Sequence, residues 1–350
     1  MRYGRAVRQF SCPRCSSALA VDSLTCGACG LEVGLHPPTR TVRAAPEQGI
    51  DVDGTWWFRC ANRRWDCSWL TAGDSGSGQC FSCRLTRTRP SADDTLALEK
   101  LATASASKRR LLVQLAELGL PVTPWYERPG GLGFDLLSSR TNGSRVVIGH
   151  ANGIVTIDLA ETLDAHREQL RVSLGEPYRT MLGHFRHEVG HYYQWVLVEQ
   201  TGWIDECREL FGDERASYAD AIARHYRTGA PRGWTEGYIS EYATMHPWED
   251  FAECWAHYLH MTDTLTTAAA AAMRLGDEVV PRATYGDATM ADVLTDWRPV
   301  STFLDSANRA MGKSDLYPFA IVEQVARKLD FVHRVVQASR VEQVLVTSSS

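Results

Sequence analysis

Residues 181–195 read MLGHFRHEVGHYYQW, and this stretch carries the clearest structural signal in the chain. Its centre is the pattern HExxH, in which His187 and His191 stand four residues apart. On a helix this spacing puts two side chains on one face, so both imidazoles reach the same metal ion. Glu188 lies further around the helix, on the side from which it accepts a proton from metal-bound water.

The residues around this pattern predict a helix. Gly190 costs roughly 1 kcal/mol inside a helix, so we expect the backbone at this glycine to pack closely against another element beneath the metal. Apolar side chains recur at helical spacing, at Met181, Phe185, Val189 and Tyr192.

A second segment, residues 240–260, reads SEYATMHPWEDFAECWAHYLH and predicts another helix. Pro247 suits the first helical position, and Glu249 and Glu253 share one face at a spacing of four. The first carboxylate is a candidate third metal ligand. The second is a candidate partner for the outer nitrogen of a ligating histidine. Asp250 stands beside Glu249 and competes for the ligand role.

Other polar residues in these segments have simpler interpretations. We expect His184 and His246 to make local hydrogen bonds or to cap a helix. We expect His257 and His260 to be packing residues. The run FGDER at 211–215 forms a structural ion pair or lines the cleft, and the sequence leaves both interpretations open.

Eight of the ten cysteines fall within residues 12–83, in two sets of four. A CxxC loop lets two thiolates reach one ion, and two pairs complete a zinc tetrahedron that is closed and therefore structural. Interleaved pairing between the sets, iron–sulfur ligation and ordinary buried cysteines are the alternatives. The predicted sets are Cys12, Cys15, Cys26 and Cys29, and then Cys60, Cys67, Cys80 and Cys83.

The 350 residues have the composition of an ordinary globular protein, with 44% hydrophobic and 23% charged residues. Residues 1–90 hold twelve arginines against seven acidic residues, an excess that zinc-bound thiolates largely offset. A protein or nucleic-acid partner of the cysteine module is therefore an open expectation. The chain starts without an apolar leader, and no apolar run reaches the roughly 18 residues of a membrane span. We expect a cytoplasmic protein without membrane contact.

After the cysteines the sequence pattern changes. Residues 94–118 place apolar side chains at helical spacing, and Gly119 follows as a C-cap. Residues 132–160 hold β-rich runs separated by Asn-Gly turns, and from Glu161 onward nearly every segment is predicted helical. Strands followed by helices indicate an α+β fold.

Together these motifs resemble a known group of proteins. HExxH followed by a helical ExxxE is the signature of gluzincin metallopeptidases, and residues 242–253 are similar to the lethal-factor type. Over nearly its whole length the chain resembles a bacterial family of zinc-binding metallopeptidases with an N-terminal zinc ribbon. The shared motifs are CAN (60–62), CSWL (67–70), SCRLTRT (82–88), KRRLL (108–112), GHFRHEVGHYY (183–193), FGDER (211–215) and HPWEDFAECWAHYLH (246–260).

The resemblance implies a zincin-like catalytic domain, in which a small twisted sheet accompanies a mainly helical second half. With it we expect two domains, a zinc-ribbon module at residues 1–90 with two four-cysteine sites and a metallopeptidase domain at residues 91–350. One catalytic and two structural zinc ions follow from this arrangement.

The resemblance also assigns roles to individual positions. It implies that Tyr242 donates a hydrogen bond to the oxyanion formed during hydrolysis, with Tyr238 as the next candidate. The residues that match the family's metal-binding, catalytic and histidine-orienting positions are His187, His191, Glu249, Glu188 and Glu253, in the roles given above.

The function favoured by these patterns is hydrolysis of a peptide or protein substrate by zinc-activated water, with Glu188 as general base. One alternative is an adaptor whose zinc ribbons bind a partner while the zincin domain is a scaffold, although a scaffold has no need of Glu188. Another is a zinc amidase acting on a non-peptide. A long groove with a free strand edge, such as residues 153–159, favours an extended peptide. A closed pocket favours a small amide.

Overall fold

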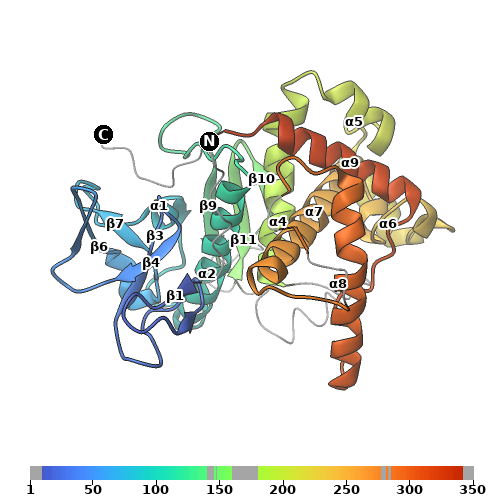
Figure 1. Ribbon diagram of the computed structural model, residues 1–350. Helices are drawn as coiled ribbons and strands as arrows, with labels where there is room; N and C mark the ends of the chain where they lie inside the picture. Colours follow the sequence, from blue (N-terminus) through green and yellow to red (C-terminus); the bar gives the residue numbers. More distant parts are fainter. Residues whose placement is uncertain are drawn as a thin grey trace. The chain divides into compact units, whose positions relative to one another are not determined.

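The computed structural model describes residues 10–139, 146, 148–159, 180–276, 281–282 and 285–341 (Figure 1). The chain divides into two compact units. Unit 1 comprises Met1–Thr162 with Val341–Ser350, and unit 2 comprises Leu163–Arg340. The fold is α+β, as the sequence predicts, with a cysteine-rich N-terminal region and a helical C-terminal part. A division by compactness does not test the predicted domain boundary near residue 90, which stays a prediction.

The cysteine-rich region is built from short antiparallel strands. Tryptophan and small apolar residues make its core, with Trp57 packed against Leu70. The pairs are β1 (Phe10–Ser11) with β2 (Ala18–Leu19), β3 (Val33–His36) with β4 (Thr41–Ala44), and β5 (Ile50–Val52) with β6 (Thr55–Arg59), which also pairs with β7 (Leu70–Ala72).

A four-stranded mixed sheet completes unit 1, in the order β10-β11-β9-β8. The helix predicted before it is α2, and Gly119 beyond its end has the positive φ of a C-cap residue. Asn152 and Gly153 both have positive φ and join β10 to β11 in the tight hairpin expected of Asn-Gly. The elements are α1 (Phe81–Arg84), β8 (Thr86–Thr88), α2 (Thr95–Glu117), β9 (Gly133–Leu137), β10 (Gly149–Ala151) and β11 (Ile154–Asp158).

One expectation about this sheet is wrong. Residues 153–159 were expected to offer a free edge to a peptide, but β11 is an inner strand. It pairs with β10 on one side and in parallel with β9 on the other along Ile154–Asp158. Its backbone groups are therefore already used by its neighbours, and the outer strands of the sheet are β10 and β8.

In the part that the structure describes, unit 2 is built mainly from helices joined by loops. The predicted helical run after Glu161 begins in residues 161–179, which lie outside the described residues. None of the helices within the described ranges is long and apolar enough to span a membrane. The helices are α4 (Met181–Tyr193), a π-helical turn (Gln194–Glu199), α5 (Ile204–Phe211), α6 (Tyr218–Thr228), 3₁₀ turns at Trp234–Glu236 and Tyr242–Thr244, α7 (Pro247–Ala270), α8 (Met290–Ala310) and α9 (Glu323–Ala338).

The contact between α4 and α7 is the centre of this unit (Figure 1). A Cβ placed on Gly190 of α4 would lie 3.0 Å from the Cα of Ala252 and 3.2 Å from the Cβ of Trp255, both on α7. Any larger residue would push the two helices apart. The close approach expected at Gly190 is therefore present, and it explains why a poor helix former stands between two metal-ligand candidates.

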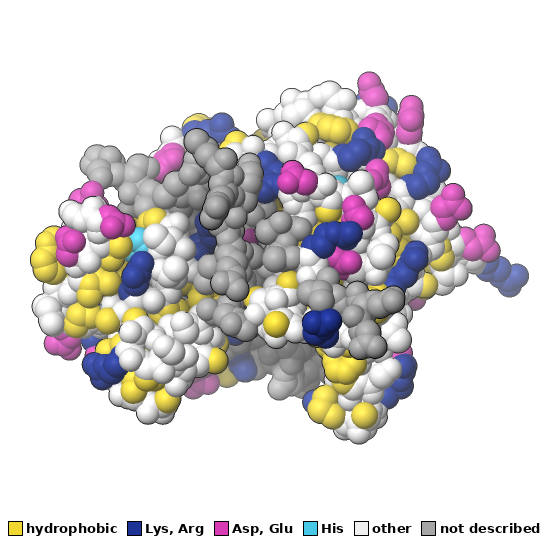
Figure 2. All heavy atoms as spheres, in the orientation of Figure 1, with side chains coloured by type: hydrophobic (Ala, Val, Ile, Leu, Met, Phe, Trp, Pro, Cys, Tyr) yellow, Lys and Arg dark blue, Asp and Glu magenta, His cyan; other side chains and the backbone are white. Residues whose placement is uncertain are grey.

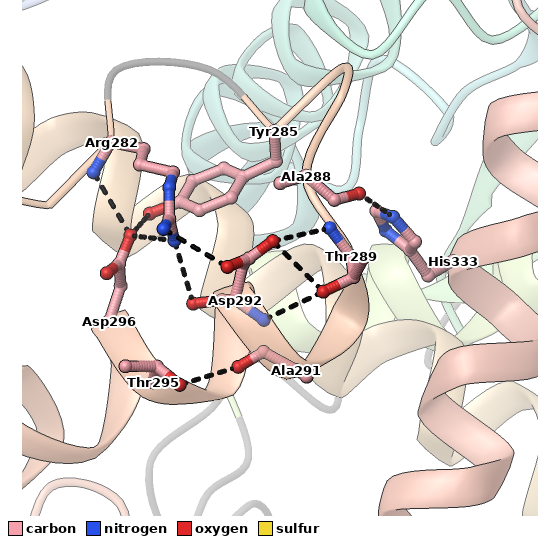
Figure 3. A network of polar contacts seen from close by, with 9 residues as sticks. All are labelled: Arg282, Tyr285, Ala288, Thr289, Ala291, Asp292, Thr295, Asp296 and His333. Carbon is pink, nitrogen blue, oxygen red and sulfur yellow. Dashed lines mark hydrogen bonds and ion pairs between the residues drawn. The ribbon is translucent and has the colours of Figure 1, made fainter.

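A polar network fixes the start of α8 against α9 (Figure 3). Thr289 and Asp292 cap the helix reciprocally, each side chain bonding the other's backbone. Arg282 forms ion pairs with Asp292 and Asp296. From α9, His333 donates a hydrogen bond from Nε2 to the carbonyl of Ala288 at 2.9 Å. These contacts hold α8 and α9 as one support beside α7.

The surface of unit 2 mixes both signs of charge. Figure 2 shows acidic and basic side chains interspersed over α5 and α9, where Arg334 pairs with Glu206. Exposed ion pairs of this kind contribute about 0–1 kcal/mol each. The stability of the unit therefore comes mainly from its buried apolar helix faces.

Candidate metal centre

Two histidines of α4 form one side of the candidate centre. Thr180 caps the helix by accepting a hydrogen bond from the amide of Gly183, so the helix is established before the histidines are reached. His187 and His191 lie one turn apart, with their ring centroids 5.0 Å from each other. Helical spacing thus brings two imidazole side chains to one place.

The third side comes from the first turn of α7. Glu249 is 3% exposed, and its Oε2 lies 2.9 Å from Nε2 of His187 and 3.6 Å from Nε2 of His191. The ligand atoms of all three residues lie within 4.8 Å of one another. Two imidazole nitrogens and a carboxylate oxygen facing one point are a donor set that suits catalytic zinc and leaves a fourth position open.

The charges around this point favour a cation. Burial raises the pKa of Glu249, but His191 and His187 outweigh it and hold that pKa well below its usual value. Burial lowers the pKa of His187, while Glu249 and Glu253 raise it well above the ordinary histidine value. Carboxylates therefore lie close enough to the imidazoles to stabilise positive charge at this buried point.

Glu253 orients His187 from outside the ligand triangle. Its Oε1 lies 2.8 Å from Nδ1 of His187, and its Oε2 accepts a hydrogen bond of 2.7 Å from the hydroxyl of Ser240. A carboxylate on Nδ1 keeps a proton there, so Nε2, which donates to Glu249 in this structure, is the nitrogen that would give up its proton to bind a metal. The structure thus places Glu253 where the sequence suggested, and it adds Ser240, which no spacing rule identified.

Glu188 lies beside the ligands with one oxygen unused. It is 5% exposed, and its Oε1 is 3.3 Å from Nε2 of His184. Its Oε2 is buried and has no hydrogen-bond partner among the described residues. Burial raises the pKa of Glu188, but the neighbouring histidines lower it overall, so the group stays an ionised proton acceptor. His184 therefore makes a local polar contact, as expected, and that contact is to the candidate base.

Asp250 does not compete with Glu249 for the metal. It points away from the histidines and is fully buried against α9, where its Oδ2 lies 2.5 Å from Nζ of Lys328. The same ammonium donates to the carbonyl of Gly237 at 2.8 Å. Burial raises the pKa of Asp250 to about 7, against the opposing effect of Lys328. The two adjacent carboxylates of α7 therefore have different partners, the histidines of α4 for Glu249 and Lys328 for Asp250.

Two tyrosines stand next to the ligands. Tyr242 places its ring 5.8 Å from the ring of His187. Tyr218, the first residue of α6, donates its hydroxyl hydrogen to Oε1 of Glu249 at 2.7 Å. Burial and the charge of Glu249 raise the pKa of Tyr218, so the hydroxyl stays protonated and remains a donor. Sequence reasoning missed Tyr218, because its 31-residue separation from Glu249 leaves no local pattern.

The remaining polar residues have structural positions. In the FGDER run, Glu214 pairs with Arg208 at 2.6 Å and Asp213 pairs with Arg215 at 2.7 Å, which favours the ion-pair interpretation. His246 caps α7 by accepting from the amide of Trp248 through Nδ1. Its position immediately before Pro247 was the signal for that role.

The cysteines of unit 1 form the two sets that the sequence proposed, without interleaving. Cys12–Cys29 and Cys15–Cys26 have Sγ–Sγ distances of 3.6 Å. In the second set the distances are 3.7 Å for Cys60–Cys83 and 3.6 Å for Cys67–Cys80 and Cys67–Cys83. Tetrahedral zinc with bonds of about 2.3 Å separates its sulfurs by about 3.8 Å, whereas a disulfide needs about 2.0 Å. Both sets therefore fit structural zinc.

A buried lysine accompanies the second set. Lys108 of α2 is 1% exposed and donates to the carbonyl of Ser82 at 2.7 Å. Burial lowers its pKa to about 8, while Cys83 and Cys80 oppose this. Its ammonium therefore lies where it offsets the negative charge of four thiolates on one divalent ion.

A cavity of about 290 Å³ opens beside the metal centre within unit 2. His187, Glu188, Tyr242 and Glu253 form part of its lining, so the cavity reaches one of the three ligand candidates, His187, and the candidate base. Ala256, His257 and His260 of α7 also line it. It is the space in which a substrate would meet these groups.

Comparison with known proteins gives a consistent result. Residues 97–335 match the family described as "Putative zinc-binding metallo-peptidase", and residues 9–94 match a zinc-ribbon domain. No solved structure matches the chain. Proteins that are 43% identical over 333 residues, 94% of this chain and 95% of each relative, are the uncharacterized proteins Rv2568c and MT2644 of two Mycobacterium tuberculosis strains and Mb2598c of Mycobacterium bovis.

Proposed function

This chain belongs to that family of zinc-binding metallopeptidases, and from this premise we propose that it hydrolyses peptide bonds with a zinc-activated water. One observation carries the proposal. His187, His191 and Glu249 direct their ligand atoms to one point, while the buried Oε2 of Glu188 beside them has no partner among the described residues. A base with one unbonded carboxylate oxygen next to three metal-type donors is an arrangement that a purely structural metal site does not need.

The roles of the ligands follow from their contacts. His187, His191 and Glu249 would hold zinc, which when bound polarises a carbonyl and makes water acidic. Glu253 keeps the proton of His187 on Nδ1, so Nε2 stays available as a ligand. Tyr218 holds the second oxygen of Glu249. These contacts fix the ligands before a substrate arrives, which lowers the reorganisation needed for catalysis.

Glu188 carries the proton transfer. Its ionised carboxylate accepts a proton from the attacking water at Oε2 and then delivers it to the nitrogen of the leaving amine. His184 contacts the other oxygen, which leaves Oε2 as the oxygen without a hydrogen bond among the described residues. Tyr242, beside His187, is proposed to donate a hydrogen bond to the carbonyl oxygen as negative charge develops on it.

The first test counts zinc ions in the full chain by elemental analysis. We expect about three per chain for the unchanged protein, from one catalytic and two four-cysteine sites, and about two for His187→Ala. His225→Ala, the same change at a histidine of α6, is the matched control and should keep the full count. A count near two in all three proteins would remove the catalytic site and favour an adaptor whose ribbons bind a protein or nucleic acid.

The second test measures hydrolysis of a mixed fluorogenic peptide library. Glu188→Gln should retain all its zinc and lose turnover, and Glu209→Gln, at an exposed position of α5, should leave turnover unchanged. Full activity of Glu188→Gln would contradict the mechanism. A zinc-loaded protein that cleaves small amides but no peptide would make it a non-peptide amidase instead.

A further inference from the structure

The cavity beside Glu188 is assembled from four separate parts of unit 2. The beginning of α4 forms one wall, and the segment around residues 234–242 forms a second. Residues of the middle turns of α7 and residues 318–320, between α8 and α9, complete the lining. A cavity whose lining includes so many residues besides the reacting groups has room for a part of the substrate that does not react.

Several apolar side chains line the cavity. They are Trp234, Ile239, Ala256 of α7 and Phe319. The ring of Phe319 is held edge-on against the ring of His257, with centroids 4.5 Å apart. Aromatic and aliphatic walls of this kind gain free energy by removing apolar surface of a ligand from water.

Polar groups of α4 and α7 that line the cavity have partners of their own. His257 shares a hydrogen bond of 2.7 Å between Nδ1 and the hydroxyl of Tyr317. Arg186 forms an ion pair of 2.5 Å with Asp263. Burial lowers the pKa of His257 to about 4 and that of His260 to about 3, so both rings are neutral near pH 7. These lining groups therefore present little uncompensated charge.

We propose that this cavity binds one large uncharged side chain of the peptide substrate, aromatic or branched aliphatic, next to the bond that is cleaved. Ala256 and Phe319 set the size that it accepts. The inference rests on the proposed peptidase function and adds its substrate class. A volume of about 290 Å³ is at the lower end for ligand cavities, which suits a single large side chain better than a whole drug-sized molecule.

A basic side chain is the main competitor for this cavity. Among the lining carboxylates, Glu188 contacts His184 and Glu253 contacts His187 and Ser240. Glu241 also lines the cavity and is half-buried, so it offers a partner to a lysine or arginine. The experiment must therefore separate an apolar preference from a basic one.

The experiment uses fluorogenic peptides that differ in one residue on either side of the cleaved bond, with Phe, Leu, Ala, Glu or Lys there. We expect kcat/KM for Phe or Leu to exceed that for Glu and Lys by roughly 10- to 200-fold. Ala256→Phe should remove the preference for Phe and Leu by filling the cavity. A preference for Lys that Glu241→Gln abolishes would overturn the inference, and so would equal rates for all peptides.

A second variant guards against misfolding of Ala256→Phe. Phe319→Ala enlarges the cavity and should lower kcat/KM for the Phe peptide without loss of zinc. Phe303→Ala makes the same change at a side chain that is 47% exposed on α8, and should have no effect. Equal kcat/KM values of Phe319→Ala and Phe303→Ala for the Phe peptide would also contradict the inference.

Binding to Glu188→Gln separates this inference from the proposed function. Fluorescence anisotropy of labelled peptides on the zinc-loaded variant measures recognition without turnover. If the unchanged protein cleaves peptides and neither assay shows an apolar preference, the cavity inference fails and the peptidase function stands. If Glu188→Gln selects Phe peptides while the unchanged protein cleaves none, the function fails and the cavity assignment stands.

Discussion

Tyr218 offers the sharpest test of how the metal centre is held. Its hydroxyl donates to Oε1 of Glu249 at 2.7 Å, while Oε2 of the same carboxylate faces His187 and His191. Tyr218→Phe removes this single donor and keeps the ring. A hydrogen bond to a charged group contributes about 1.5–3 kcal/mol, and Tyr218 is half-buried, so we take the lower part of that range.

This energy predicts the size of the effect on zinc. A loss of about 1.5–2 kcal/mol corresponds to roughly 13- to 30-fold weaker zinc binding at the catalytic site, which agrees with the range seen for groups that orient metal ligands. The cysteine sites should be unaffected. The assay is competition of the full chain against a chromophoric chelator, in which the weakest-bound zinc leaves first.

Tyr226→Phe is the matched control, because Tyr226 lies on the same helix and is 69% exposed. It should release zinc as the unchanged protein does. If Tyr218→Phe also releases zinc at the unchanged chelator concentration, the hydroxyl does not orient Glu249 in solution. The reasoning about the ligand shell would then be refuted, whatever happens to turnover.

Three further outcomes follow from buried groups of unit 2. Lys328→Met removes the cation that opposes the raised pKa of Asp250, so the buried carboxyl takes up a proton and loses its partner; the free energy of unfolding in urea should fall by about 1–3 kcal/mol, and Met at both positions should recover much of the loss. Gly190→Ala brings a Cβ to 3.0 Å from the Cα of Ala252, so it should lower the free energy of unfolding by about 1–3 kcal/mol in the same assay. The size of this decrease should be the same at pH 5 and at pH 7. Burial lowers the pKa of His257 to about 4 in the folded protein. Its neutral ring therefore contributes fully to the free energy of unfolding above about pH 6.5. This contribution is lost as the pH falls towards 4, because the unfolded chain then binds a proton that the folded protein does not. His257→Gln should therefore reduce the difference in stability between pH 7 and pH 5 relative to the unchanged protein; an identical pH dependence would contradict a neutral buried ring.

The elements that sequence predicts well are those whose geometry is local. The spacing of His187 and His191 fixes their common face as soon as the segment is helical. Pro247 marks where the next helix begins, and Glu249 and Glu253 then follow on one face for the same reason. Gly190 was also interpretable, since a glycine inside a helix needs a packing reason and Ala252 supplies it.

The elements that sequence misses depend on pairing across long stretches of chain. Tyr218 and Glu249 are 31 residues apart, and Asp250 and Lys328 are 78 apart. No periodicity relates such positions, so neither the tyrosine nor the lysine was identified. The error about the free edge of β11 has the same origin. The alternation of side chains predicts a strand but not its neighbours, and β10 and β9 occupy both of its sides.

Glu249 and Asp250 are adjacent on α7 but face different partners. Their positions show how one helix contributes both to the metal centre and to the cavity proposed to bind a substrate side chain. Successive residues of a helix are turned by about 100°, so Glu249 faces the histidines of α4 while Asp250 faces Lys328 of α9. The stripe that starts at Glu249 continues along α7 into the cavity. Metal ligand, histidine-orienting carboxylate and cavity-lining residues are therefore parts of one rigid surface, pressed against α4 at Gly190. A change in the α4–α7 contact must then alter zinc binding and side-chain selection together, whereas a change at Phe319 alters selection alone. The stripe consists of Glu249, Glu253, Ala256, His257 and His260.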